Sequence, residues 1–139
     1  MLYINGKWLE GKGKNFRSCN PSSNTNIWEG KYASSNQVNN AVNSAYIAYH
    51  KWRNIDFESR LEIIEKFYSL VELNKDTIKD LIKLETGKET KDSIAEVGAS
   101  LAKYKNSLNA FHLRTGKSSS PLGKNIQITN HRPHGILNV

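Results

Sequence analysis

Residues 90–113 read TKDSIAEVGASLAKYKNSLNAFHL, and this stretch decides the class of fold. Its apolar side chains recur in alternating steps of three and four residues, at Ile94, Val97, Leu101, Tyr104, Leu108 and Phe111. That period predicts a long helix with one apolar seam that packs on other helices. We expect Gly116 to close it.

Three shorter helices are predicted before this one. Ser34 and Gln37 have the spacing of a capping box, followed by an apolar face along residues 36–53. Asp56 can cap the next helix, whose stripe is Leu61, Ile64, Tyr68 and Val71. Asn74 breaks that run and is predicted to cap a third helix, with Gly87 at the left-handed position that ends it.

The two ends of the chain are predicted to be β-like. Asn5-Gly6 suits the type I′ turn of a hairpin, and a further strand is expected around Ile27 and Trp28. Residues 118–123 are polar and turn-rich, which predicts a linker. Strands are expected at Ile126 with Ile128 and at residues 136–139.

The predicted fold class is therefore α+β, mainly helical, within one domain. Residues 1–33 form a β-hairpin region, residues 34–116 a helical region, and residues 117–139 a linker and a strand pair. The chain stops a few residues into an apolar strand, as we expect of a chain cut from a longer one.

The net charge of +7 is unevenly distributed. All 13 acidic residues lie before residue 97, whereas Lys103, Lys105, Arg114, Lys117, Lys124 and Arg132 follow it. This skew fits a phosphate-binding surface, an acidic partner or an anionic substrate. No run of five like charges occurs, which argues against a nucleic-acid-binding protein.

The composition also indicates in which cellular compartment the protein is expected. The sequence has no apolar run of membrane-spanning length, and residues 1–6 lack the features of a secretory signal. A single cysteine suits a reducing compartment. We expect a cytoplasmic protein.

Three candidate sites have simpler explanations. Cys19 has no evident base beside it, so we expect a turn residue rather than a nucleophile. His131 and His134 lack further ligands for a metal and are expected to shape a turn. The glycines near the amino terminus lead into a turn instead of a helix, so they do not form a phosphate loop. We therefore predict no catalytic, cofactor-binding or metal-binding residues.

The order of the motifs resembles the start of the aldehyde dehydrogenase superfamily. The matching segments are Ile4-Asn5-Gly6 with Trp8, Asn20-Pro21, Ala41 with Ala45 and Trp52, Ser59-Arg60, Glu85-Thr86-Gly87-Lys88, and Arg132-Pro133 with Gly135. Glu89 departs from the family, which often has proline there. Residues 111–116 (FHLRTG) and 131–135 (HRPHG) are similar to the N-succinylglutamate 5-semialdehyde dehydrogenases.

This resemblance implies oxidation of that semialdehyde with NAD in arginine breakdown. In such enzymes the oxyanion-stabilising Asn, the cofactor-contacting Lys, the Glu base and the Cys nucleophile follow the position of Val139. The resemblance therefore implies that this chain is inactive alone and binds no cofactor, whereas the full-length relative uses NAD.

Lys105 and His112 are the predicted substrate-entrance residues. They lie two helical turns apart on one shoulder of the apolar seam. The implied substrate carries two carboxylates, which cationic groups would attract. The alternative is that Lys105 lies along apolar surface and His112 packs beside Phe111.

Self-association is the predicted form of partnership. Unpaired strand edges and exposed helix seams can pair with other chains. We therefore expect a dimer or higher oligomer, or binding to the remainder of the enzyme. An oligomerising interaction module is the alternative to an enzyme segment.

Overall fold

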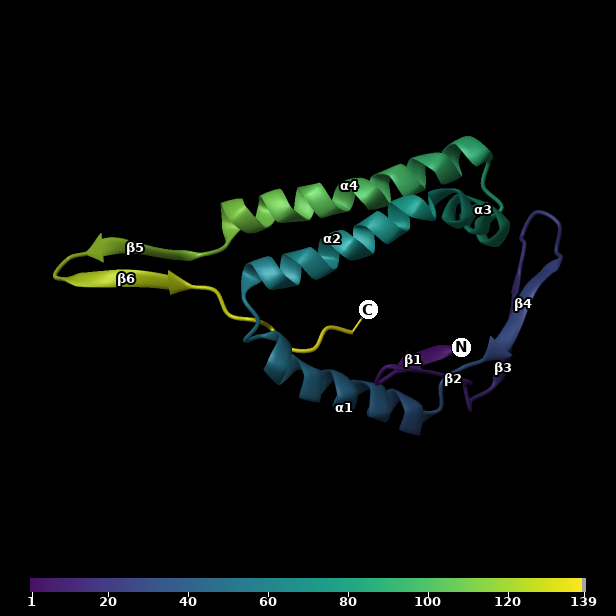
Figure 1. The fold of residues 1–139 in the computed structure, drawn as a ribbon, viewed down its shortest axis with the longest axis horizontal. Helices are drawn as coiled ribbons and strands as arrows, with labels where there is room; N and C mark the ends of the chain where they lie inside the picture. The colour runs from purple at the N-terminus through teal and green to yellow at the C-terminus, as the bar shows by residue number, and fades with distance from the viewer. Residues whose placement is uncertain (139) are drawn as a thin grey trace.

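The computed structural model describes residues 1–138 as four helices and three separate two-stranded antiparallel sheets. In chain order these are β1 (Leu2–Ile4), β2 (Lys7–Leu9), β3 (Asn15–Cys19), β4 (Asn26–Lys31), α1 (Ser35–Trp52), α2 (Phe57–Leu73), α3 (Lys75–Thr86), α4 (Thr90–Arg114), β5 (Lys117–Leu122) and β6 (Asn125–Asn130). Helices α2 and α4 run side by side with α3 at one end, α1 lies across from them, and the β5–β6 hairpin projects away (Figure 1). The predicted α+β class is confirmed.

The β1–β2 hairpin turns at Asn5 and Gly6, as predicted. Their φ angles are 50° and 75°, the left-handed values that a type I′ turn requires. The register pairs Tyr3 with Trp8, and their rings lie 5.0 Å apart. The hairpin rests on α1 through β1.

The β3–β4 hairpin is organised around a glycine. Phe16 lies directly opposite Gly30 in the register, so no side chain faces its ring. The Phe16 ring instead contacts the diagonal neighbours, edge-on to Trp28 at 4.7 Å and stacked on Tyr32 at 4.5 Å. Aromatic cross-strand pairs of this kind stabilise a two-stranded ribbon.

Gln37 joins the start of α1 to the loop before β3. Its side chain completes the predicted capping box with Ser34. It also donates to the carbonyl of Glu10 at 2.8 Å and accepts from the Lys12 N–H at 2.8 Å. Only 7% of Gln37 is exposed. The residue that caps α1 therefore also makes buried contacts with the loop before β3.

The helix ends agree with the sequence at two positions and differ at one. Asp56 accepts from the Ser59 N–H at 2.8 Å and begins α2, and Gly87 ends α3 with a φ of 70°. Asn74 stands at the predicted N-cap position of α3, but its side chain makes no capping hydrogen bond; its amide donates to the Leu70 carbonyl at 2.8 Å instead. The prediction was wrong there because the side chain satisfies an orphan carbonyl at the end of α2.

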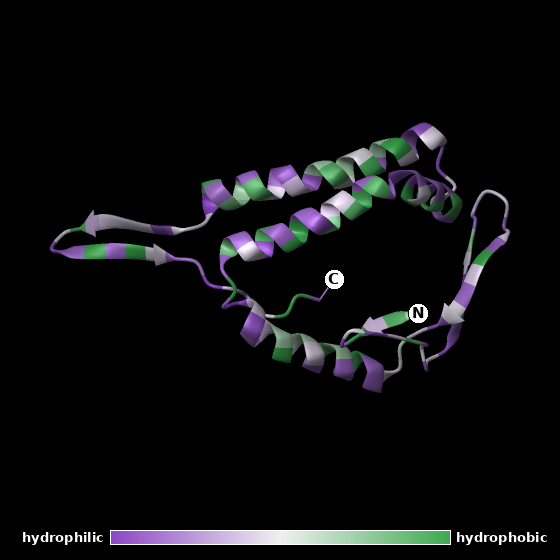
Figure 2. Cartoon of the chain, in the orientation of Figure 1, coloured by the Kyte–Doolittle hydropathy of each residue, from purple (hydrophilic) through white to green (hydrophobic). Residues whose placement is uncertain are grey.

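The packed interior is small. Helix α4 packs chiefly on α3 and more lightly on α2, and Val97 is the one buried apolar side chain among residues 1–138. Ile94, on the same predicted seam, remains 56% exposed. Figure 2 shows hydrophobic residues spread along the helices and along β6 rather than gathered in one centre.

The carboxyl-terminal strand pair lies elsewhere than predicted. Lys117–Leu122, expected as a linker, is β5 and pairs with β6 across the turn at Gly123. Residues 131–138 form no strand and run back toward α1 and β1; Val139, the last residue of the expected strand, lies outside the described residues. The prediction was wrong because Gly123 has a φ of 60°, which lets the polar segment Lys117–Leu122 turn back and pair with β6 through its backbone.

None of the helices described between residues 1 and 138 is long and apolar enough to cross a membrane.

Candidate functional site in the groove between α2 and α4

Lys105 lies in a groove between two helices. Helix α2 contributes Glu65, Tyr68, Ser69 and Glu72, and α4 contributes Leu101, Ala102, Tyr104 and Lys105. The aliphatic part of Lys105 therefore has apolar neighbours, and its ammonium group shares the groove with two carboxylates. Because Glu65 and Glu72 outnumber Lys105, the groove as described is not a cationic pocket.

Tyr104 ties the two walls of this groove together. Its hydroxyl donates to Oε1 of Glu65 at 2.6 Å, and its ring lies 5.1 Å from that of Tyr68. The hydrogen bond to the Glu65 carboxylate raises the pKa of Tyr104 to about 12, because ionisation would break the bond and place two negative charges together. Tyr104 is therefore a hydrogen-bond donor near neutral pH and cannot act as a base.

His112 does not share the groove with Lys105. It lies near the carboxyl end of α4, where Phe57 and Phe111 stack at 4.3 Å with nearly parallel rings. The imidazole lies edge-on at 5.8 Å from each of these rings. The structure thus places the two predicted entrance residues in different surroundings, and His112 packs beside Phe111.

The glycine-rich start of the chain has no room for a phosphate. A Cβ on Gly11 would lie 2.1 Å from the Lys31 carbonyl oxygen, and one on Gly13 would lie 2.9 Å from that of Ala33. These glycines allow close contact with the backbone after β4, and the chain then enters β3 instead of a helix. The residues present do not fit the phosphates of a dinucleotide, which need free backbone N–H groups at a helix start.

Cys19 lies in one hairpin and His131 directly after another, whereas His134 lies in the irregular segment after β6. Cys19 is half-buried at the end of β3, opposite Asn26 and beside an irregularity in the ladder. His131 donates from Nδ1 to the carbonyl oxygen of Gly116 at 2.8 Å, closing the base of the β5–β6 hairpin. Over residues 1–138, no three His, Cys, Asp or Glu side chains gather as a metal site.

Two motifs that are far apart in the sequence meet at the end of α3. A Cβ on Gly87 would lie 2.5 Å from Oγ of Ser22 and 3.0 Å from Pro21, so the Asn20-Pro21 turn sits directly on Gly87. Glu85 accepts from Nε1 of Trp28 at 3.1 Å and from Oγ of Ser18 at 3.4 Å. Sequence reasoning missed this contact because no local spacing relates residues about 60 positions apart.

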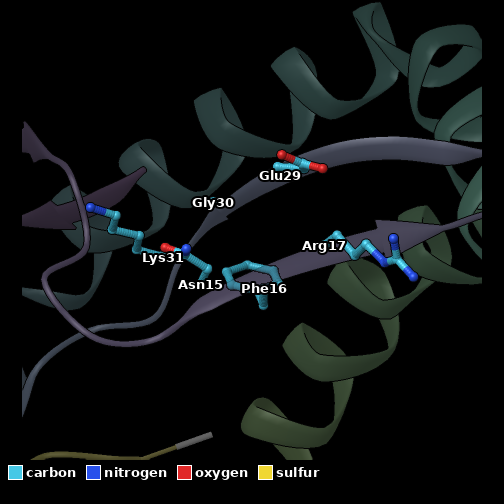
Figure 3. A pocket seen from close by; sticks show the side chains of 6 residues that line it. All are labelled: Asn15, Phe16, Arg17, Glu29, Gly30 and Lys31. Atoms are coloured by element: carbon cyan, nitrogen blue, oxygen red, sulfur yellow. The ribbon is translucent and has the colours of Figure 1, made fainter.

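A second hollow lies on the β3–β4 ribbon, lined by Asn15, Phe16, Arg17, Glu29, Gly30 and Lys31. Figure 3 shows Arg17 and Glu29 extending from neighbouring strands at one side and Lys31 beside Asn15 at the other. Gly30 lies between them, and a Cβ on it would lie 2.6 Å from the ring of Trp28. The charges of both signs are those of an exposed ribbon surface, and the lining contains no thiol or imidazole.

Comparison of the chain with known proteins identifies the family to which it belongs. The family model described as "Aldehyde dehydrogenase family" matches residues 8–139. The chain is 37% identical over 138 residues to an N-succinylglutamate 5-semialdehyde dehydrogenase of Acinetobacter baylyi, and 39% identical to that of Salmonella dublin. In both comparisons the match covers 99% of this chain and 28% of the relative.

Solved structures agree. An NAD-dependent benzaldehyde dehydrogenase from Corynebacterium glutamicum superposes with a TM-score of 0.77 at 26% identity, over 88% of this chain and 27% of that one. An aldehyde dehydrogenase from Bartonella henselae, at 20% identity, shares the fold with a TM-score of 0.79. The order of motifs, the contacts between them and the match over residues 8–139 lead to one conclusion: this chain belongs to the aldehyde dehydrogenase family.

Proposed function

We propose that this chain is the amino-terminal scaffold of an NAD-dependent enzyme that oxidises N-succinylglutamate 5-semialdehyde in arginine breakdown. The observation that carries the proposal is the 37% identity over 138 residues to relatives of that name. The similar segments include residues 111–116, at the carboxyl end of α4, and residues 131–135, directly after β6. We place this enzyme in the cytoplasm, in keeping with its single cysteine.

The part of the reaction that this chain contributes is positional. Oxidation of an aldehyde through a thiohemiacetal needs a thiolate and a base that can reach it. The one thiol, Cys19, is paired into the β3–β4 ribbon, and the Tyr104 hydroxyl is held protonated by Glu65. We therefore propose that the 139-residue chain is inactive alone and that NAD, the hydride acceptor, binds to other parts of the whole enzyme.

Activity measurements test this proposal in two parts. The purified chain with NAD and the semialdehyde should produce no NADH above a buffer blank, and turnover would contradict the inactivity. A chimera in which this chain replaces the matching segment of the Acinetobacter baylyi enzyme should keep its kcat/KM within about tenfold. A chimera that folds like its parent but no longer oxidises the semialdehyde would contradict the scaffold role.

Lys105 remains a proposed substrate-entrance residue, and His112 is proposed with it. Within the groove, Glu65 and Glu72 oppose attraction of a dicarboxylate, so the effect of Lys105 should be modest. In the chimera, Lys105→Met should raise KM for the semialdehyde several-fold and leave KM for NAD unchanged, and His112→Gln should behave in the same way. Lys103→Met is the matched control on the same helix; an equal effect there would remove the assignment.

Self-association is a second candidate function, favoured by one observation. The apolar residues of β6 are open to solvent, with Ile126 72% and Ile128 57% exposed. Exposed strands with apolar faces pair with other chains. No contact or pocket of the described residues favours nucleic-acid binding.

A further inference from the structure

The tip of the β1–β2 hairpin carries a reactive dipeptide. Asn5-Gly6 is the one Asn-Gly pair in the sequence, and both residues are exposed. No atom lies within 4 Å of the position that a Cβ on Gly6 would occupy. We propose that Asn5 is a self-modification site, at which the chain converts its own side-chain amide to aspartate and isoaspartate.

The chemistry needs only the chain and water. The backbone nitrogen of Gly6 attacks Cγ of Asn5; a new C–N bond forms, the Cγ–Nδ2 bond breaks, and the amide proton of Gly6 leaves with the Nδ2 amino group as ammonia. Water then opens the resulting five-membered imide at either carbonyl, which yields aspartate or an isoaspartate linked through its side chain. Nothing is oxidised or reduced. Glycine permits the attack because it has no side chain to crowd the approaching carbonyl.

The hairpin is built to open at this point. Each of its strands has three residues. A two-stranded hairpin is marginally stable in water, and the contact of β1 with α1 leaves Asn5 and Gly6 exposed. The hydrogen-bonded turn restrains the Gly6 nitrogen, so ring closure proceeds in molecules whose hairpin has frayed. Fraying of short terminal elements costs little free energy, and the solvent-exposed tip meets no cover.

Two other asparagines provide internal comparisons. Asn24 also has a left-handed φ, 54°, and is exposed. It is followed by Thr25, whose branched side chain crowds the attacking nitrogen. Asn20 precedes Pro21, whose nitrogen carries no hydrogen. Imide formation should therefore be fastest at Asn5, slower at Asn24 and absent by this route at Asn20, and all three positions can be compared in one sample.

The modification would change the hairpin itself. An isoaspartate inserts an extra carbon into the backbone, so the register that pairs Tyr3 with Trp8 cannot be kept. Leu2 and Ile4 line a surface with Val38 and Ala41 of α1, and a shifted β1 would leave it. The state of Asn5 thus reports whether the hairpin is held closed.

Peptide mapping tests the proposal. The folded chain is incubated in mildly alkaline buffer, digested with trypsin, and the peptides of residues 1–7 and 18–31 are followed by mass spectrometry with fragmentation that separates isoaspartate from aspartate. Asn5 should convert several-fold faster than Asn24 in the same sample, with isoaspartate as the larger product. Equal rates, or aspartate alone, would overturn the proposal.

A denatured sample and a variant complete the design. In urea the rate at Asn5 should rise only a few-fold, because the hairpin already opens; a rate suppressed a hundredfold or more by folding would contradict that. Asn5→Gly keeps a turn that favours left-handed residues and cannot be modified. It should retain the tryptophan fluorescence that the parent chain partly loses during incubation, whereas an equal loss in this variant would also count against the proposal.

Discussion

Two glycines of this chain differ in the space around them: one has backbone atoms close by, and the other has none. Gly11 is buried against the backbone after β4, where an added Cβ would lie 2.1 Å from the Lys31 carbonyl oxygen. Gly98 lies within α4, where an added Cβ meets nothing within 4 Å. The first glycine is required by tertiary contact, whereas the second only weakens its helix.

Gly11→Ala should therefore destabilise the chain and Gly98→Ala should stabilise it. We expect the free energy of unfolding in urea to fall by about 1–3 kcal/mol for the first because of overpacking. For the second it should rise by about 0.5–1 kcal/mol, the difference between the two residues in a helix interior. Equal effects of the two substitutions would contradict the contact at Gly11.

Asp56 makes the start of α2 sensitive to acid. Hydrogen bonds from the backbone N–H and the hydroxyl of Ser59 lower the pKa of this carboxyl below its ordinary 3.8. A lowered pKa means that the cap stabilises the fold above the ordinary value and that this contribution is lost as the pH falls through the folded-state pKa.

Asp56→Asn isolates this effect because asparagine caps helices as well as aspartate but does not titrate. The Tm of the parent chain relative to the variant should fall as the pH passes below 3.8, the ordinary pKa of Asp56. Thermal melting of both chains across the acid range measures it. A difference in Tm that does not change with pH would show that folding does not lower the pKa of Asp56.

At the scale of elements, the helix boundaries could be predicted from neighbouring residues, whereas the pairing of β5 with β6 could not. The capping box at Ser34 and the glycine after α3 were predicted because a cap involves neighbours in sequence. β5 was predicted as a linker because its serines carry no apolar alternation. Its pairing with β6 depends on backbone hydrogen bonds across a turn, which side-chain patterns do not report.

Gln37 connects these elements, and its removal should cost more than its place in a cap suggests. Gln37→Ala leaves the Lys12 N–H and the Glu10 carbonyl without partners. We expect the free energy of unfolding to fall by about 1–3 kcal/mol, the cost of buried polar groups left unsatisfied. Urea denaturation of Asn36→Ala, a change at an exposed neighbour in α1, provides the control. If the free energy of unfolding falls by a similar amount in both variants, the contacts of Gln37 with Glu10 and Lys12 do not stabilise the fold.

At the scale of the whole molecule, the arrangement is open. The helices surround no common core (Figures 1 and 2), and large apolar side chains such as Tyr46, Ile47 and Phe67 remain more than half exposed. Monomeric proteins seldom expose such surfaces. The chain spans 28% of the length of the curated relatives that it matches, in which further sequence is available to cover these faces.

The isolated chain should therefore form dimers or larger oligomers. Ile126→Lys combined with Ile128→Lys should shift sedimentation toward the monomer, because both side chains lie on one face of β6. Gln127→Lys with Thr129→Lys adds the same charge to the opposite face and should change the distribution less. A parent chain that sediments as a clean monomer at tens of micromolar would contradict this prediction.

Short-range periodicity and the order of motifs were enough to predict the helices, most of their caps, the first hairpin and the family. Three features appear only in the folded chain: β5 pairs with β6, Gly87 contacts the Asn20-Pro21 turn, and Lys105 and His112 lie apart. Lys105 faces Glu65 and Glu72 across a helix pair, while His112 meets Phe57. The physical reason is that these contacts join residues distant in sequence, whose approach depends on how whole elements pack.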